Sequence, residues 1–312
     1  MKYKTIVTTL YESHYDYGVG ALLNSLVSSG FEGLFCIGYK GAAPFWLNQL
    51  NPIKGETGLY QLTDAVRVRL DLLEPGMHFG YYKPHYLQQM RHEYPGAQSY
   101  FYFDPDIVVL AKWEFYETWV KSGIAVCQDI FYQFLHYNHP WRTVWRSDYA
   151  DFDEGVNAQW NYYINSGFIG VTPQRFEVID RWVAITAVYK DLGYPIDYFN
   201  QAEALSPYKG DQDVLNAVLT LNRSLEISPL SKDAMGFDFP VAVMAHAVDG
   251  GGVKPWKREY IKHALKGKKA SVTDEAFLNY CRTPIELYSA KSLKGKRRLL
   301  KISKLINRIW KR

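Results

Sequence analysis

Short apolar runs alternate with amphipathic segments along most of the chain, and this pattern predicts a layered α/β fold. Runs typical of buried strands cover residues 3–10, 34–39, 58–62, 99–110, 123–130, 162–171 and 241–246. Apolar residues at helical spacing predict helices over residues 17–29, 43–50, 83–93, 175–192 and from residue 210 onward. Strands that alternate with helices pair mostly in parallel, so we expect a largely parallel sheet covered by helices.

Residues 131–161 interrupt this pattern with a polar and aromatic stretch. Connections inside compact domains are rarely this long unless they carry a function. We therefore expect a lid or binding loop here, and its aromatic side chains are candidates for the wall of an acceptor site.

The length of 312 residues suits one large domain or two small ones, and 47% hydrophobic residues are enough for a sizeable core. Cys36, Cys127 and Cys281 are odd in number and far apart, which argues against a disulfide framework and suits a reducing compartment. The chain enters a predicted strand at once and has no apolar run of about 18 residues. We therefore expect no signal peptide, no membrane-spanning helix and a cytoplasmic location.

The charges are distributed unevenly. Of the 36 Lys and Arg residues, ten lie in residues 291–312, which contain no Asp or Glu; the other 26 are outnumbered by 32 acidic residues. An acidic body argues against a nucleic-acid partner. The tail also carries apolar residues at helical spacing, namely Leu299, Ile302, Leu305, Ile306 and Ile309. A basic amphipathic helix is typical of a segment lying on an anionic membrane surface; a solvated or nucleic-acid-binding tail is the alternative.

Two carboxylates follow an aromatic strand at Asp104-Pro105-Asp106. Pro105 cannot donate to a sheet, so the strand should end or bulge there, and residues two apart in an extended chain point to the same side. Adjacent carboxylates repel one another unless a cation lies between them, and oxygen ligands suit Mg²⁺, Mn²⁺ or Ca²⁺. Taken alone, the motif is more often a plain acidic turn.

Other segments also have both a chemical and a structural interpretation. His246 ends a predicted strand and is either a structural residue or a third metal ligand. Residues 250–252, all Gly, and Lys254 suit either a phosphate-binding loop or a flexible turn. Residues 211–213 hold acids that also favour a helix N-terminus, and residues 165–167 also fit a β-bulge.

Together and in this order, these motifs resemble glycosyltransferase family 8, the GT-A group that includes bacterial lipooligosaccharide galactosyltransferases. The matching motifs are Asp104-Pro105-Asp106 (DxD), Asn165-Ser166-Gly167, Asp211-Gln212-Asp213, and His246 with Gly252, Lys254, Pro255 and Trp256. The resemblance covers roughly residues 3–258. It implies a GT-A fold with a Rossmann-like mixed sheet, a UDP-sugar donor, Mn²⁺ (or Mg²⁺) as cofactor, and retention at the anomeric carbon.

The resemblance also implies which residues hold the metal and the diphosphate. Asp104, Asp106 and His246 match the metal ligands. Lys254 matches the lysine that reaches the diphosphate, and Gly252 belongs to the same loop.

Further residues match positions near the sugars. Gln212 matches the amide on the β-face of the donor sugar, and Asp211 matches an acid that contacts its hydroxyls. Asp129 matches the acid near donor and acceptor, while Lys83 and Asn165 fall at donor-binding positions.

Two features depart from the family pattern. The family usually has an acid directly after the first strand, facing uracil; here Thr8 and Tyr11 are the candidates to bond and stack the base. The loop from His246 to Lys254 is also longer than expected.

We therefore expect a cytoplasmic retaining hexosyltransferase, peripheral on the inner face of the membrane, that moves galactose or glucose to a surface glycan or lipid-linked saccharide. Its catalytic domain should cover residues 1–265, and a helical extension should cover residues 266–312 with the basic tail. Gln212 is a poor nucleophile, so we favour front-side attack by the acceptor. The alternatives are a nucleotide-sugar hydrolase and a non-catalytic binding module recruited to membranes.

Overall fold

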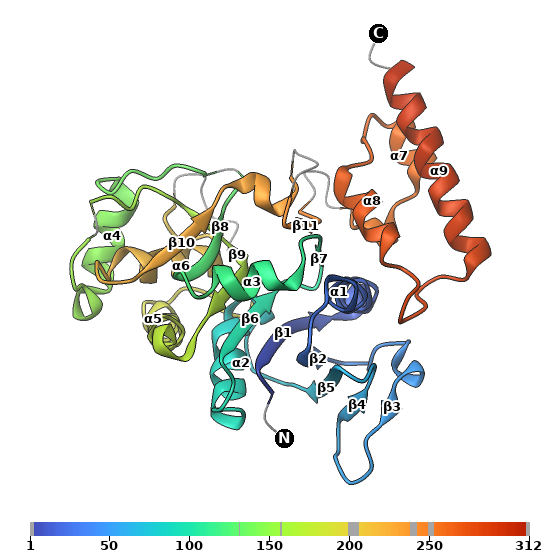
Figure 1. Ribbon diagram of the computed structural model, residues 1–312. Helices are drawn as coiled ribbons and strands as arrows, with labels where there is room; N and C mark the ends of the chain where they lie inside the picture. The colour runs from blue at the N-terminus through green and yellow to red at the C-terminus, as the bar shows by residue number, and fades with distance from the viewer. Residues whose placement is uncertain are drawn as a thin grey trace. The chain divides into compact units, whose positions relative to one another are not determined.

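The computed structural model describes residues 3–130, 132–156, 158–198, 206–237, 242–248 and 253–309. The chain divides into two compact units. The first combines residues 1–10, 73–103 and 114–232, and the second combines residues 11–72, 104–113 and 233–312 (Figure 1). Neither unit therefore comes from one continuous segment.

The described strands of the first unit form a mixed sheet. Their order is β10 (Ile227–Leu230), β8 (Ile124–Gln128), β9 (Ile164–Val171), β6 (Ser99–Phe103) and β1 (Thr5–Glu12, with residues 5–10 in this unit). β6 pairs in parallel with β1, and β10 with β8, whereas β9 runs antiparallel to β6 and β8. Every residue of β6 is buried, because its aromatic sequence packs on both faces of the sheet.

Helices cover this sheet. They are α2 (Phe79–Glu93), α3 (Trp113–Trp119), α4 (Pro140–Asp148), α5 (Glu177–Asp191) and α6 (Asp211–Thr220). α5 packs on α2 and α6, α2 packs on β6, and α6 packs on β9 and α4 (Figure 1). On α3, Trp119 stacks on Phe168 of β9 with ring centroids 5.1 Å apart, so aromatic contacts join helix and sheet.

The second unit has its own strands. β2 (Gly33–Lys40) pairs in parallel with β5 (Val66–Leu72), and β4 (Leu59–Gln61) runs antiparallel to β5 and to β3 (Asn51–Pro52). A separate antiparallel pair joins β7 (Ile107–Val109) to β11 (Met244–His246). The helix α1 (Asp16–Ser29) packs on β7 and ends at Gly30, whose φ of +90° lets its N–H reach the carbonyls of the last turn.

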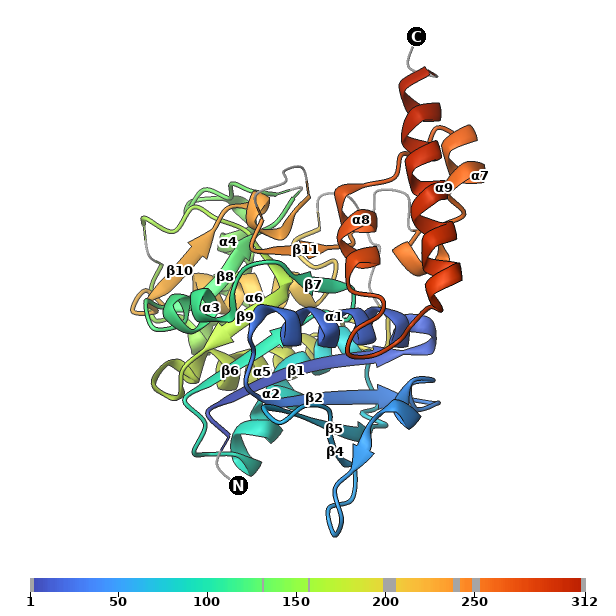
Figure 2. The same cartoon turned by 45° about the vertical axis from the view of Figure 1, so that its right-hand side comes forward.

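The same unit contains three C-terminal helices, α7 (Tyr260–Leu265), α8 (Val272–Asn279) and α9 (Ala290–Ile309). α9 runs alongside α7 and α8 (Figure 2). Leu293 and Leu300 form its buried face. The predicted division at residue 265 stays a prediction.

The predicted fold class is confirmed, because strands and helices alternate and the mixed sheet is flanked by helices. The helices expected over residues 17–29, 83–93 and 175–192 are α1, α2 and α5, with shifted ends. The segment 99–110 breaks into β6 and β7 at the Asp-Pro-Asp turn, as Pro105 predicts.

One local expectation is wrong, and two elements were not predicted. Residues 43–50 form only a short 3₁₀ turn at Leu47–Gln49, because the Trp46 indole is buried and donates to the Asp16 carbonyl (2.8 Å). The alternating strand β5 was not anticipated. The segment 131–161 contains α4, which His139 caps and whose amphipathic pattern is too short to stand out in the sequence.

Asn24 of α1 links this helix to the chain after α8. Its side chain is buried, and its amide donates to the carbonyls of Tyr280 (2.7 Å) and Ile285 (2.8 Å). Its carbonyl oxygen accepts from the Ile285 N–H (2.8 Å). One side chain thus satisfies three backbone groups.

We expect Asn24→Ala to lower the free energy of unfolding by about 3 kcal/mol or more, because each unsatisfied buried group costs roughly 1–3 kcal/mol. Urea denaturation measures this change. The exposed Asn48 supplies the control, since Asn48→Ala should change stability by less than about 0.5 kcal/mol. Equal losses in both variants would show that these hydrogen bonds contribute nothing.

Candidate functional site

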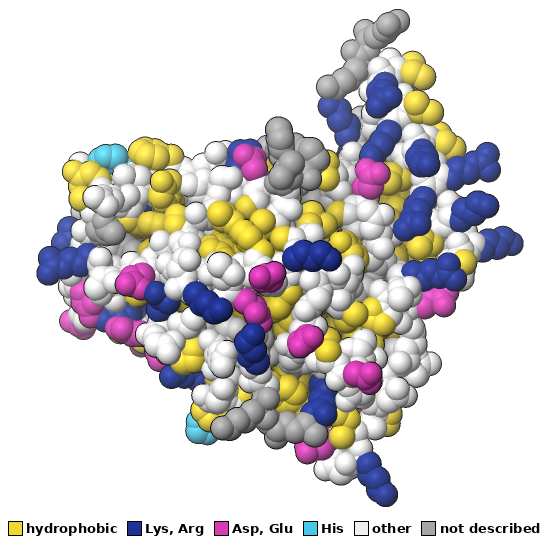
Figure 3. Space-filling model, in the orientation of Figure 1, with side chains coloured by type: hydrophobic (Ala, Val, Ile, Leu, Met, Phe, Trp, Pro, Cys, Tyr) yellow, Lys and Arg dark blue, Asp and Glu magenta, His cyan; other side chains and the backbone are white. Residues whose placement is uncertain are grey.

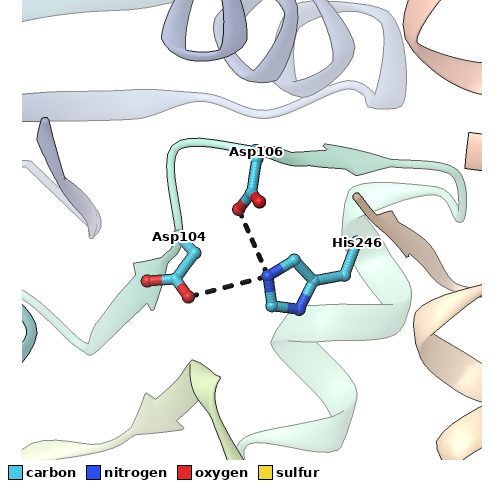
Figure 4. Close-up of side chains that lie close together, drawn as sticks. All are labelled: Asp104, Asp106 and His246. Atoms are coloured by element: carbon cyan, nitrogen blue, oxygen red, sulfur yellow. Dashed lines mark ion pairs between the residues drawn. The ribbon is translucent and has the colours of Figure 1, made fainter. Parts of the chain in front are cut away.

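The described residues of the second unit include two carboxylates and an imidazole arranged as a cation site. His246 Nε2 lies 3.2 Å from Asp106 Oδ1 and 3.6 Å from Asp104 Oδ2 (Figure 4). One candidate ligand atom from each residue lies within 4.8 Å of the other two. Asp106 and His246 are buried and Asp104 is half-buried, so solvent reaches the group mainly at Asp104.

Backbone pairing brings these side chains together. Asp104 and Asp106 lie in the turn before β7, and the antiparallel pairing of β11 sets His246 opposite Ile107. The Ala247 N–H continues this pairing by donating to the Asp106 carbonyl (3.0 Å). The histidine therefore reaches the carboxylates from a strand that is distant in the sequence.

Lys254 lies against the same group. Its ammonium donates to Asp106 Oδ2 and to the Ala247 carbonyl (3.0 Å), and it lies 5.6 Å from the centroid of the Tyr15 ring. Burial raises the pKa of the Asp106 carboxyl, but His246 and Lys254 outweigh burial and hold this pKa well below its usual range. Asp106 is therefore ionised at neutral pH.

Gly18 allows α1 to approach the Asp104–Asp106 turn. A Cβ at position 18 would lie 2.1 Å from the Pro105 carbonyl oxygen and 2.8 Å from the Trp256 ring. Atoms cannot pack that closely, so any side chain here would displace the turn or the ring. Glycine at this position is part of what positions the two carboxylates.

The donor set fits a divalent cation. Carboxylate oxygens and a neutral imidazole suit Mn²⁺, and neighbouring acids need a compensating cation. His246 turns Nε2 toward the carboxylates, and its buried Nδ1 has no hydrogen-bond partner among the described residues. Asp104, Asp106 and His246 are the residues that would hold the ion.

The first unit contains a second charged cluster, built around Lys83 of α2. The buried Lys83 Nζ lies 3.0 Å from Asp211 Oδ2 and donates to the Ser166 carbonyl (3.2 Å). Ser166 Oγ donates to the same Asp211 oxygen (2.7 Å). The Tyr102 ring lies 5.3 Å from the ammonium. A buried acid thus compensates a buried lysine, as such charges require.

A bulge in β9 organises this cluster. The β8–β9 pairing shifts register at Asn165, because Val126 pairs with Ile169 but the next residue, Cys127, pairs with Asn165. Residues 166–168 are therefore inserted in β9 relative to β8. Within the bulge, the Ser166 N–H donates to Gln212 Oε1 (3.2 Å). Asn165 donates its side-chain amide to Asp129 Oδ2 (3.1 Å). The bulge interpretation is therefore confirmed, and the bulge also gathers the predicted sugar-site residues of this unit.

Asp213 caps the start of α6. Its carboxylate accepts from the N–H groups of Lys209 (2.6 Å) and Gly210 (3.1 Å) and from the Tyr163 hydroxyl. The helix N-terminal interpretation is confirmed for Asp213, whereas Asp211 makes the ion pair described above. Burial raises the pKa of Asp213 to about 6, although these hydrogen bonds favour its ionised form.

The two residues predicted to contact a base are both buried. Thr8 has no exposed surface, and its hydroxyl donates to the Phe101 carbonyl (3.0 Å). The Tyr11 hydroxyl donates to the Ala42 carbonyl (3.2 Å), and its ring lies nearly parallel to Tyr39 at 6.0 Å. Tyr39 is half-buried, so it is the ring of this pair that has surface to offer a ligand.

The sequence patterns did not predict Ser166 or Tyr15 as site residues. Ser166 lies inside the strand break that was recognised, so that motif was its signal. Nothing in the local sequence marks Tyr15, which only tertiary packing brings to Lys254. Gly252, with the rest of the glycine run, lies outside the described residues.

The aromatic segment after β8 connects to the Lys83 cluster through Asp129. The Tyr132 N–H donates to Asp129 Oδ1 (3.2 Å). Lys209 Nζ lies 4.9 Å from the centroid of the Tyr132 ring and 5.2 Å from that of the Trp141 ring. Phe134 is 66% exposed. This segment therefore presents aromatic surface, and its use as an acceptor wall stays a prediction.

Several solved glycosyltransferases have a similar architecture. The galactosyltransferase LgtC, in complex with donor and acceptor sugar analogs, matches with a TM-score of 0.51 and 14% identity over 93% of this chain and 99% of its own. The bifunctional glycosyltransferase WbbM matches with a TM-score of 0.53 and 15% identity, and this chain spans 52% of it. The glycosyltransferase GlyE of Streptococcus pneumoniae matches with a TM-score of 0.52 and 14% identity over 97% of this chain and 65% of its own.

The chain has a glycosyltransferase fold. The GT-A fold expected from its motifs is confirmed over nearly the whole described chain. No protein-family model and no curated protein matches the sequence.

Lys254→Met should bind Mn²⁺ about tenfold more tightly than the wild type when no nucleotide is present. The substitution frees Asp106 Oδ2 and removes a positive charge that repels the ion. Electron paramagnetic resonance of free Mn²⁺ measures the affinity. Lys257→Met, at an exposed position nearby, should leave it unchanged; equal affinities in all three proteins would contradict the competition between Lys254 and the ion.

The stability of the wild type should fall between pH 4.5 and pH 7 because of Asp213. Its folded-state pKa of about 6 exceeds its ordinary value of 3.8, so the unfolded chain releases this proton first as the pH rises. Relative to Asp213→Asn, the wild type should lose about 2 kcal/mol of unfolding free energy over this range. Urea denaturation of both proteins at pH 4.5 and pH 7 measures this change. If the difference in unfolding free energy between the wild type and Asp213→Asn is the same at both pH values, the raised pKa of Asp213 is refuted.

Proposed function

We propose that this protein is a metal-dependent retaining glycosyltransferase that moves a hexose, galactose or glucose, from a UDP-sugar to a saccharide acceptor. One observation carries the proposal: Asp104, Asp106 and His246 converge, with Lys254 beside them, in a chain that has a glycosyltransferase fold. The likeness to a galactosyltransferase solved with donor and acceptor sugar analogs supports a donor of this class.

Breaking the bond between sugar and phosphate leaves negative charge on the nucleoside diphosphate. A divalent cation held by the three residues would supply Lewis-acid stabilisation of that charge. Lys254 supplies a second cation and is already oriented by Asp106 and the Ala247 carbonyl. We propose that its ammonium moves from Asp106 to a phosphate oxygen when the donor binds.

The Lys83 cluster is proposed to act on the sugars. Asp211 and Gln212 would contact hydroxyls of the donor sugar, Lys83 would orient Asp211 through their ion pair, and Asp129 with Asn165 would position donor and acceptor. A neutral amide is a weak nucleophile, so we propose front-side attack without a covalent intermediate. The acceptor oxygen bonds to the anomeric carbon, the bond to the diphosphate breaks on the same face, and the hydroxyl proton passes to the leaving phosphate.

A thermal-shift assay with UDP-galactose and UDP-glucose, each with and without Mn²⁺, tests this proposal. A ligand at 100 times its Kd stabilises the native state by about 2.7 kcal/mol, which raises the Tm. We expect this increase in Tm only when nucleotide sugar and metal are both present. Asp106→Asn should abolish it, whereas Asp151→Asn, at an exposed position, should keep it.

Failure of both UDP-sugars to stabilise the protein in the presence of Mn²⁺ would overturn the proposed function. Product analysis then separates its rivals. Free hexose released equally with and without acceptors indicates a hydrolase, and unaltered biological function of Asp106→Asn indicates a binding module.

We also propose that α9 attaches the enzyme to the cytoplasmic face of an anionic membrane, where a lipid-linked acceptor would lie. The support is an apolar strip on α9, formed by Leu299, Ile302, Leu305, Ile306 and Ile309. Leu299, Leu305 and Ile309 are 42%, 55% and 72% exposed, so this strip is separate from the buried face of the helix. Lys and Arg side chains crowd the same helix (Figure 3). None of the described helices is both long and apolar enough to cross a membrane.

Leu305→Gln combined with Ile309→Gln should weaken binding to phosphatidylglycerol vesicles at least tenfold, because burying such a side chain contributes about 1.5–3 kcal/mol. Vesicle sedimentation measures the change. Leu72→Gln with Leu192→Gln replaces two exposed leucines elsewhere and should have no effect. Equal sedimentation of the two double variants would refute the role of the apolar strip.

A further inference from the structure

A basic hollow lies along the first half of α9. Its cationic lining consists of Arg282, Lys294, Arg297, Arg298 and Lys301, and two apolar side chains of α9 complete it. Its volume of about 610 Å³ lies in the range of small-molecule sites, and none of the described residues that line it is acidic. We call this feature the basic hollow.

The cations of the basic hollow are not balanced by carboxylates. Within the part of the chain that the structure describes, none of the five makes an ion pair, whereas Lys304 of the same helix pairs with Glu275. Arg297 is held in place by its donation to the Leu278 carbonyl (3.1 Å). Cations that converge without a counter-charge repel one another, and an anion that enters among them relieves that repulsion.

Most of the basic hollow lies on a different arc of α9 from the apolar strip. At 3.6 residues per turn, Lys294 and Lys301 project between the buried face of the helix and the apolar strip, and Arg298 lies on the arc of the strip, two turns before Leu305. A helix that lies with its apolar strip in a membrane surface holds the neighbouring arc at the depth of the lipid headgroups. The basic hollow would then face the phosphates.

We propose that the basic hollow binds the phosphate of a phosphomonoester or diphosphate lipid headgroup while the apolar strip lies in the membrane. Such a group carries more than one negative charge and several acceptor oxygens, so it engages several of the five cations at once. Arginine forks bind phosphate with two parallel hydrogen bonds, and the third terminal oxygen and second charge of this group favour it over a singly charged phosphodiester. The inference extends the proposed membrane attachment and is independent of the transfer reaction.

The test compares vesicles that contain phosphatidic acid with vesicles that contain phosphatidylglycerol, adjusted to equal surface charge. The 312-residue protein should bind vesicles with phosphatidic acid about tenfold more tightly at about 0.15 M salt, where weak surface attraction is screened. Arg298→Gln with Lys301→Gln should remove this preference. Lys291→Gln with Arg308→Gln removes the same charge from α9 outside the basic hollow and should weaken both vesicle types alike while keeping the preference.

Three outcomes would overturn the proposal: no preference in the wild type, an equal loss of preference in the two double variants, or tight binding of inorganic pyrophosphate with no discrimination between vesicles. The last outcome would assign the basic hollow to a free phosphate compound. The assay contains no nucleotide sugar, so its failure is distinguishable from a failure of the donor-binding test.

Discussion

The pairing of β11 with β7 is the constraint on which the candidate metal group depends. It fixes His246 opposite the strand that follows Asp104 and Asp106, and the Ala247 N–H extends it to the Asp106 carbonyl. The close approach of α1 at Gly18 holds the same turn from another side. Rigid backbone elements, rather than flexible side chains, therefore set the spacing of these candidate ligands.

Three buried carboxylates among the described residues are each paired with a cation. Asp106 is bound by Lys254, Asp211 is bound by Lys83, and Asp274 is bound by Arg258 at 3.3 Å. Such pairs add little net stability over apolar packing, but removing one partner leaves an uncompensated buried charge and is costly. The first two pairs therefore constrain the chemistry of their surroundings, because a ligand must either replace a partner or bind alongside it.

α9 combines three surfaces on one helix. Leu293 and Leu300 pack inward, the apolar strip faces outward, and most of the basic hollow lies between them. The sequence of this helix is strongly basic, yet only the fold decides which basic residues share a space. Its role in structure and its proposed role at a membrane are therefore compatible, since they use different arcs.

The sequence by itself determined the α/β class, the helices α1, α2, α5 and α6 and the strand break at the Asp104–Asp106 turn, because hydrophobic period and proline chemistry act locally. It did not reveal the helix α4 or the strand β5, whose patterns are short, nor the burial of Thr8 and Tyr11, because burial depends on what packs above a strand. Only the tertiary structure decided that Lys254 binds Asp106, that Ser166 joins Lys83 to Asp211, and that five cations of the C-terminal region line one hollow. These contacts join residues from separate elements, and their distances are fixed by strand register and helix packing, which no local pattern encodes.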